Sequence, residues 1–180
     1  MVFPIALQDG VVLRVVEPTD AAALADAAER NREHLAPYEP DRDPSHYTEE
    51  GQLDAIEKAL TAMAQGRRIP LVLAHRDGIV GGLNLNDIVR GAFDNGHVGY
   101  WTDANYQGRG LMSTAVEHLA AYARDGLGLH RLQAATLPEN ERSQRVLARA
   151  GFERIGYARE YLNIAGRWQD HVLFQRILSR

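Results

Sequence analysis

Residues 96–124 read GHVGYWTDANYQGRGLMSTAVEHLAAYAR, and this stretch decides how the chain folds. It starts with a β-branched and aromatic run, Val98 to Thr102, which favours a strand. After a polar turn, apolar residues recur at helical spacing from Leu111 to Ala123. The stretch therefore predicts a strand, a turn and an amphipathic helix, and the corner before the helix contains two glycines.

That corner has the features of an anion site. Gly108 and Gly110 lack side chains where the helix begins, so a bulky polar ligand can approach the backbone there. The start of a helix offers unpaired N–H groups and the positive end of the helix dipole, which suit phosphate, and Arg109 adds a cation. Neither the G-x-G-x-x-G dinucleotide fingerprint nor the G-K-[ST] of a Walker loop is present. The alternative is a tight turn with a structural role only.

Composition sets limits on the rest. The chain has 180 residues, 45% of them apolar, which is enough for a single domain over residues 1–180. A net charge of −4 gives no basic field for nucleic acid. There is no cysteine, which excludes disulfides, thiolate metal sites and a cysteine nucleophile, and fits a cytoplasmic protein. No apolar run is long enough to cross a membrane, and the N-terminus lacks the features of a signal peptide.

The pattern along the chain mixes strands and helices. The elements expected in the first half are strands over 5–7 and 11–16 joined at Asp9-Gly10, a helix from Pro18 to Pro37, an irregular loop over 37–47, a helix from 48 to Gly66, and strands over 69–75 and 79–88 joined at Arg76-Asp77-Gly78. The elements expected after residue 124 are a strand over 131–137, a helix over 141–150 with Gly151 as its cap, and strands over 155–162 and 170–177 around a turn at 163–168. Because strands and helices do not strictly alternate, we expect an α/β domain of the α+β type, with a mixed, mostly antiparallel sheet flanked by helices.

Two motifs in this order resemble the GNAT (Gcn5-related N-acetyltransferase) family over essentially the whole chain. Gln107-Gly108-Arg109-Gly110 is similar to the family's acyl-CoA pyrophosphate loop, R/Q-x-x-G-x-G/A, and Met112 departs from its small final residue. The second motif, N-x-x-S-x-x-V/L followed by G-F, is matched by Asn140 to Phe152. The resemblance implies a single GNAT domain that binds acetyl-CoA.

Within the family, the chain resembles most the bacterial ribosomal-protein-alanine and ribosomal-protein-serine N-acetyltransferases, and among these the serine enzyme. The similar segments are Gly99-Tyr100-Trp101, Gly110 to Ser113, Arg159 to Asn163, and Asp170. The resemblance implies that the acceptor is the N-terminal α-amine of a ribosomal protein, and that a homodimer is possible. One departure is an extra pair, Ile164-Ala165, which is expected to lengthen a hairpin beside the acceptor pocket.

The resemblance also assigns the cofactor contacts. They are Trp101, Thr102, Gln107, Gly108, Arg109, Gly110, Leu111, Met112, Ser113, Asn140 and Arg145. The backbone N–H of Trp101 or Thr102 is expected to face the thioester oxygen. A solvated helix face is the alternative for Arg145.

Two residues are candidates for proton transfer. A free α-amine has a pKa of about 7.7–8.0, so it must lose a proton before it attacks a thioester. By resemblance, Glu160 is the general base and Ser143 the acid that meets the thiolate. The alternatives are a solvated strand carboxylate for Glu160 and an ordinary helix cap for Ser143. Direct transfer without a covalent enzyme intermediate is consistent with the lack of cysteine.

The acceptor groove is expected between the loop 37–47, with its acidic residues Glu39, Asp41 and Asp43, and the hairpin 161–168. The side chains of Tyr100, Trp101 and Tyr106 are expected to pack in the sheet more than to contact a ligand, with lining of the pocket as the alternative for Tyr100. The seven histidines show no metal-ligand spacing, so no metal is expected. Two alternatives to N-terminal acetylation stay open, a GNAT enzyme for a small amine or antibiotic and a non-catalytic acyl-CoA-binding module.

Overall fold

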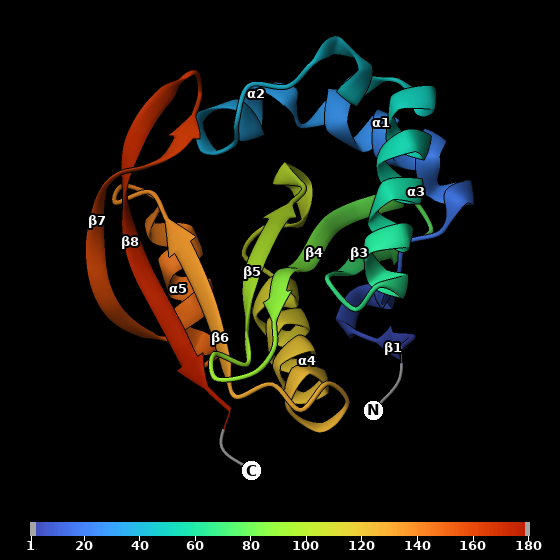
Figure 1. Cartoon of the computed structure of the whole chain (residues 1–180). Coiled ribbons are helices and arrows are strands. Elements are labelled where there is room, and N and C mark those ends of the chain that lie inside the picture. Colours follow the sequence, from blue (N-terminus) through green and yellow to red (C-terminus); the bar gives the residue numbers. More distant parts are fainter. Residues whose placement is uncertain (1–2, 179–180) are drawn as a thin grey trace.

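An eight-stranded mixed sheet forms the centre of the computed structural model, which describes residues 3–178 (Figure 1). Its strands are β1 (Ile5–Ala6), β2 (Val12–Val15), β3 (Ile69–His75), β4 (Gly78–Val89), β5 (Asn95–Thr102), β6 (Arg131–Thr136), β7 (Glu153–Ile164) and β8 (Arg167–Ile177). They lie in the order β1-β2-β3-β4-β5-β6-β8-β7, and only β5 and β6 are parallel. The expected mixed, mostly antiparallel sheet is confirmed.

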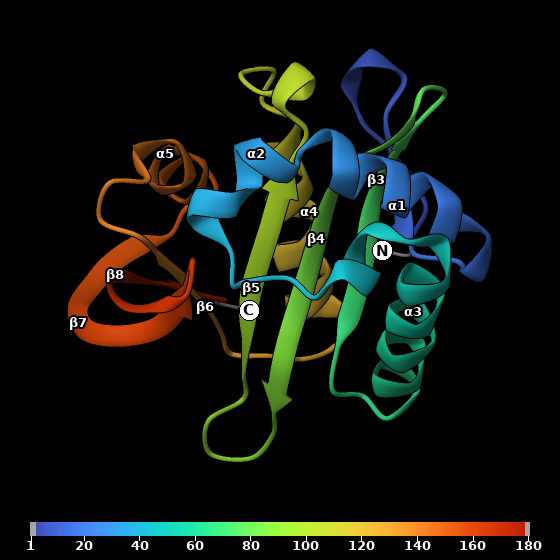
Figure 2. The ribbon, with the colours of Figure 1, turned by 90° about the horizontal axis from the view of Figure 1, so that it is seen from above.

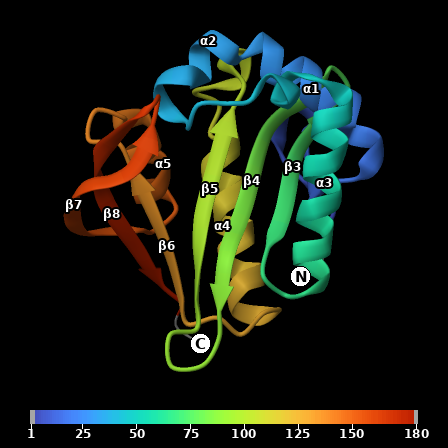
Figure 3. The same ribbon diagram turned by 45° about the horizontal axis from the view of Figure 1, so that its top comes forward.

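Helices cover both faces of this sheet (Figures 2 and 3). The α-helices are α1 (Ala21–Arg30), α2 (Arg32–Leu35), α3 (Glu49–Ala64), α4 (Leu111–Asp125) and α5 (Glu141–Arg149). The 3₁₀ helices are η1 (Gln8–Gly10), η2 (Pro18–Asp20), η3 (Ala36–Tyr38), η4 (Pro44–Tyr47) and η5 (Ala104–Tyr106). Over residues 3–178, no helix has both the length and the apolar character needed to cross a membrane.

The two faces of the sheet are covered unequally. On the α4 face, Leu83 and Leu85 of β4 join a large buried cluster that includes residues of α4 and α5. The smaller cluster on the α1 and α3 face takes Val72 from β3 but not the inner part of β4. Because side chains alternate along a strand, Asn84 and Asn86 point to this second face. The α1 and α3 face is thus apolar over β3 and at Ile79, near the start of β4, and polar at Asn84 and Asn86.

The helix expected from Pro18 to Pro37 is broken, and Asn31 is the reason. α1 ends at Arg30, and the buried Asn31 side chain donates a hydrogen bond to the carbonyl of Ala27 (2.9 Å) and another to the carboxylate of Asp103 (2.9 Å). Its amide oxygen also accepts from the N–H of Ala104 (2.9 Å). An asparagine side chain that bonds to backbone groups competes with the helix. The break therefore ties α1 to the end of β5.

The β7–β8 turn is shorter than the sequence indicated. The turn expected over residues 163–168 is only Ala165-Gly166, because β7 runs to Ile164 and β8 starts at Arg167. Ala165 and Gly166 both have positive φ (49° and 72°), as a type I′ hairpin turn requires. Ile164 is buried at the end of its strand. Of the extra pair, Ile164 thus belongs to the β7 arm of the hairpin and Ala165 to its tight turn, so the expected lengthening of the hairpin stays a prediction.

Candidate active site

The two parallel strands separate in the middle of the sheet. β5 and β6 pair only where residues 95–97 face residues 131–133. Beyond this point β5 continues to Thr102 paired with β4 alone, and β6 continues to Thr136 paired with β8 alone (Figure 1). The edge of β5 from Val98 onward therefore has backbone groups that no neighbouring strand satisfies. Such an edge can pair with the amide groups of an extended ligand.

The start of α4 lies at this opening. Gly110 is the N-cap residue, has a φ of 76°, and brings no side chain to cap the helix. The first backbone bond of the helix runs from the N–H of Thr114 to the carbonyl of Gly110 (3.1 Å). The N–H groups of residues 111–113 precede this bond, so they have no carbonyl partner within the helix. The free amides and the bare glycine backbone are the geometry that the sequence predicts for this corner, and anion binding there stays a prediction.

A cavity of about 1260 Å³ joins the helix start to the open part of the sheet. Most residues assigned by resemblance to the cofactor line it. They are Trp101, Thr102, Gln107, Gly108, Gly110, Leu111, Met112, Ser113, Asn140 and Arg145. The cavity also takes in Ser143, the candidate acid, and Asn84 and Arg68 from the polar half of the α1 and α3 face. The cavity therefore reaches the corner formed by residues 108–113 at the start of α4, the expected phosphate corner, and also the opposite face of the sheet.

Arg109 is directed away from this cavity. Its guanidinium lies over the Tyr106 ring, 4.7 Å from the centroid, and donates to the carbonyl of Asn105 (3.0 Å). The carboxylate of Asp9 is 3.7 Å away. Arg109 is not among the residues that line the cavity. Its contacts fix the outer side of the loop, so this structure does not place the guanidinium at the start of α4.

Three of the cations that line the cavity come from α5. They are Arg142, Arg145 and Arg149. The Arg142 guanidinium donates to the side-chain oxygen of Gln107 (2.6 Å), so it links α5 to the glycine loop. Sequence reasoning selected only Arg145. The spacing of three and four residues between these arginines, which puts them on one helix face, is the signal that identifies the other two.

Ser143 is paired with Tyr100, a partly buried tyrosine. Asn140 caps α5 by accepting from the N–H of Ser143 (3.1 Å), and the Ser143 hydroxyl lies 2.8 Å from the Tyr100 hydroxyl. Burial raises the pKa of Tyr100, and the hydrogen bond with Ser143 lowers it by less. The pair therefore retains two hydroxyl protons at neutral pH. Tyr100 lines the cavity, which is the alternative left open for it, but its contact with Ser143 across the opening was not predicted.

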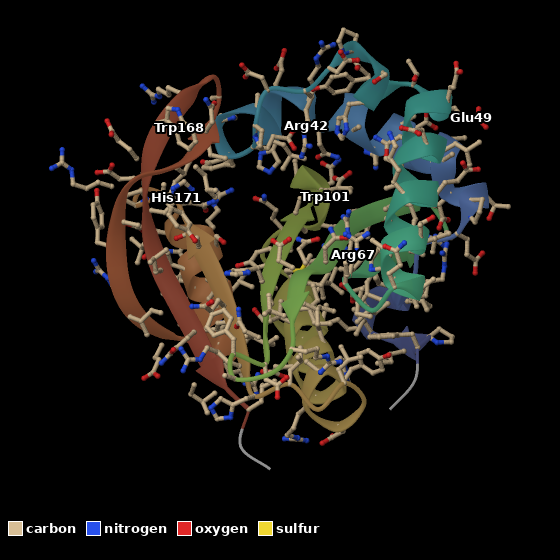
Figure 4. All side chains as sticks on the ribbon, viewed as in Figure 1. Arg42, Glu49, Arg67, Trp101, Trp168 and His171 are labelled. Carbon is tan, nitrogen blue, oxygen red and sulfur yellow. The ribbon has the colours of Figure 1, made fainter. Side chains whose placement is uncertain are left out.

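Trp101 and Tyr106 do pack against their neighbours, as the sequence suggested. The Trp101 indole lies against Gly82, where any Cβ would collide with it, and it also faces the cavity (Figure 4). The Tyr106 hydroxyl bonds to His75 (2.9 Å) and to Asp77 (3.0 Å).

Glu160 lies in a bulge on β7. The register of β7 against β8 shifts between Ala158 and Leu162, and Glu160 has a positive φ of 46°. Its N–H donates to the Asp170 carboxylate (2.9 Å), which holds this backbone conformation. The Glu160 side chain is exposed and does not line the cavity that contains Ser143. The structure thus places the two candidate catalytic residues on separate elements without a direct contact.

The two segments expected to border the acceptor groove touch each other. The N–H of Ala165 in the β7–β8 turn donates to the carbonyl of Glu39 (3.0 Å), and the Asp41 carboxylate lies against Gly166. Glu39 and Arg42 line the cavity and form an ion pair of 2.7 Å. In Figure 4, Arg42 and Trp168 mark these two segments. The loop therefore lines the cavity, whereas the hairpin packs against the loop and contributes no lining residue, so the expected groove between the two segments is not found.

Metal ligands are not grouped in the part of the chain that the structure describes. No three histidine, aspartate or glutamate side chains lie close enough there to hold an ion.

Gly108→Val is expected to raise the Kd for CoA about tenfold. Gly108 lines the cavity with a φ of 75°, a conformation that costs a β-branched residue about 1–2 kcal/mol, and the new side chain also covers the exposed amides. Gly91→Val is the matched control, because Gly91 has a φ of 84°, open space around it and a position outside the cavity. Calorimetric titration with CoA checks both. Equal Kd values for the two variants contradict a phosphate role for the loop.

Comparison with known proteins identifies a family and a relative of known sequence. The sequence model of the acetyltransferase (GNAT) domain matches residues 11–153. The chain is 39% identical over 167 residues to the [ribosomal protein uS5]-alanine N-acetyltransferase of Escherichia coli (strain K12), covering 92% of this chain and 86% of the relative.

Two solved structures are similar over nearly the whole chain. The ribosomal-protein-S5-alanine acetyltransferase of Vibrio fischeri superposes with a TM-score of 0.94 at 34% identity, over 98% of this chain and 97% of that one. Mycobacterium smegmatis RimJ in complex with CoA-disulfide superposes with a TM-score of 0.91 at 29% identity, over 98% of this chain and 86% of that one.

Proposed function

This chain belongs to the acetyltransferase (GNAT) family and is an acetyl-CoA-dependent N-acetyltransferase, and from this premise we propose that its acceptor is the N-terminal α-amine of a ribosomal protein. The relatives reported above at 39% and 34% identity are named for alanine. An alanine N-terminus is therefore the first acceptor to test, and the serine N-terminus favoured by the sequence resemblance is the second.

The observation that carries the proposal is the continuity of the cavity. A single space of about 1260 Å³ runs from the first amides of α4, past the Ser143 hydroxyl, to the polar face of β4. Ligand pockets for small molecules usually measure about 300–1,000 Å³. The volume supports two ligands that meet at the gap between β5 and β6, one of them an extended peptide.

The residues around the phosphate corner fit the cofactor. The free N–H groups of residues 111–113 and the α5 cation Arg142 are suited to its diphosphate. The unpaired edge of β5 at Trp101 and Thr102 is suited to its amide-containing arm. When bound, acetyl-CoA supplies the acetyl group as a reactive thioester.

Three groups of this chain share the chemistry in our proposal. Glu160 accepts a proton from the ammonium of the acceptor, through water, since its side chain lies outside the cavity lining. The backbone N–H of Trp101 or Thr102 donates to the carbonyl oxygen as charge builds on it. Ser143, held by Asn140 and Tyr100, donates its hydroxyl to the departing sulfur. The bulge and the positive φ at Glu160 support its role, because bulges and strained residues concentrate at functional sites.

Thiol release from acetyl-CoA tests the acceptor. Eight-residue peptides that begin with Ala or Ser are compared with the same peptides carrying an acetylated N-terminus, and with a panel of polyamines and aminoglycosides. We expect release only with the free α-amines, and mass spectrometry to find the acetyl group on residue 1. Release with the small amines but not with the peptides contradicts the proposal. The cytoplasmic location and the homodimer stay predictions.

A further inference from the structure

Arg68 is a half-buried arginine without an acidic partner. It immediately precedes β3, and its Nη2 donates to the side-chain oxygen of Asn84 (2.9 Å). Its Nε is buried and has no hydrogen-bond partner, and no described carboxylate lies within ion-pairing distance. Burial lowers the pKa of Arg68, and the charge of Asp87 raises it by less. A guanidinium remains protonated at neutral pH, so this cation has no direct ionic partner among the described residues.

The guanidinium faces the acceptor half of the cavity. Arg68 and Asn84 both line the cavity. Asn84 points to the α1 and α3 face of the sheet, since its neighbours Leu83 and Leu85 are buried on the α4 face. The α4 amides and the α5 arginines belong to the other face, where α4 and α5 pack. Arg68 is therefore placed to meet the ligand that enters from the side opposite to the phosphates.

The distance from the reaction centre sets which part of an acceptor reaches Arg68. Asn84 pairs with Gly99, so it lies one strand spacing, about 4.8 Å, from the open strand β5. The Arg68 side chain lies on the far side of Asn84 and bonds to it. An extended peptide advances about 3.3–3.6 Å per residue. A peptide with its amine at the edge of β5 thus brings residue 2, 3 or 4 to the guanidinium.

We propose that Arg68, oriented by Asn84, binds a carboxylate side chain of the acceptor at residue 2, 3 or 4; this rests on the proposed function above. A charged group held out of water needs a compensating charge, and a carboxylate fits the fork of guanidinium N–H groups with two parallel hydrogen bonds. Asn84 engages Nη2, and the other terminal nitrogen, Nη1, forms no hydrogen bond with the described residues, so terminal N–H donors stay available to a carboxylate. Arg68 is thereby a specificity residue, which selects acceptors with an acidic residue close to the N-terminus.

A peptide series measures this selection. The parent peptide has eight residues, begins with Ala and has no charged side chain. Each member of the series carries a single Asp, Asn or Lys at position 2, 3 or 4. For the wild-type enzyme we expect one of these positions at which Asp gives a KM about tenfold below Asn, with Lys above both and kcat nearly constant. Arg68→Gln is expected to remove the Asp preference, and Arg68→Lys to restore part of it.

Arg67→Gln is the matched control. Arg67 is the adjacent arginine, but it is exposed, bonds to the side chain of Gln65 and does not line the cavity, so the Asp preference is expected to persist (Figure 4). Equal KM values for Asp, Asn and Lys in the wild-type enzyme overturn the inference, as does an Asp preference that survives in Arg68→Gln. Peptides that are acetylated without charge preference overturn this inference alone, whereas a lack of acetylation of every peptide overturns the proposed function as well.

Discussion

Glu160→Gln is expected to lower kcat near neutral pH by about 10²–10⁴-fold, the range for loss of a general base. Glutamine has nearly the same size and keeps the N–H that Asp170 accepts, so the β7 bulge is preserved. The variant changes only the ability of the side chain to take a proton. Because a deprotonated amine needs no base, its residual rate should rise with pH until the acceptor amine is unprotonated, with the KM for acetyl-CoA unchanged.

Two further variants test whether the effect is specific to Glu160. Glu153→Gln changes another exposed carboxylate of β7, which bonds to the Gln175 side chain, and should retain wild-type kcat. Glu39→Gln tests a carboxylate that does line the cavity. Steady-state rates with an Ala-initiated peptide over a range of pH compare the three. If Glu160→Gln keeps the wild-type pH profile and Glu39→Gln loses activity, the general base is Glu39 and not Glu160.

The elements that the sequence predicts well are those set by neighbouring residues. The strand, corner and helix of residues 96–124 follow from β-branched residues, two glycines with positive φ and an apolar helix face, and all three are confirmed. The α5 helix starts after Asn140 and ends before Gly151 for similar local reasons. Because the family motifs lie on these elements, the phosphate corner was also predicted from the sequence.

The features that the sequence does not reveal depend on partners far along the chain. Asn31 ends α1 because it meets the Asp103 carboxylate, 72 residues later. Tyr100 meets the Ser143 hydroxyl only because β5 and α5 face each other across the opening. The direction of the Arg109 side chain is set by its contacts with Tyr106 and Asp9. Neither contact can be predicted from the spacing of residues along the chain. Side-chain direction at the site is therefore a tertiary property.

Asp103→Ala is expected to reduce the free energy of unfolding by about 3 kcal/mol. Asp103 is 1% exposed and accepts from Arg30 Nε (2.7 Å), from the side chain of Asn31 (2.9 Å) and from the N–H of Asn105 (2.8 Å). Alanine leaves these donors without their acceptor. Since the same carboxylate anchors the turn that leads to the glycine loop, CoA affinity should fall with stability.

The loss of unfolding free energy in Asp103→Ala should also depend on pH in a defined direction. Burial raises the pKa of Asp103, but the hydrogen bonds from Asn31, Asn105 and Arg30 outweigh it, so the net pKa lies below its ordinary value. A lowered pKa in the folded state gives stability that is complete above the unfolded value, about 3.9, and is lost as pH falls through the folded value. Urea unfolding of the wild type and Asp103→Ala should therefore differ most near neutral pH and converge in acid. Asp125→Ala, which removes an exposed partner of Arg124, should show no comparable loss. A difference between wild type and Asp103→Ala that persists unchanged at a pH well below 3.9 would show that the carboxylate acts through packing and not through its charge.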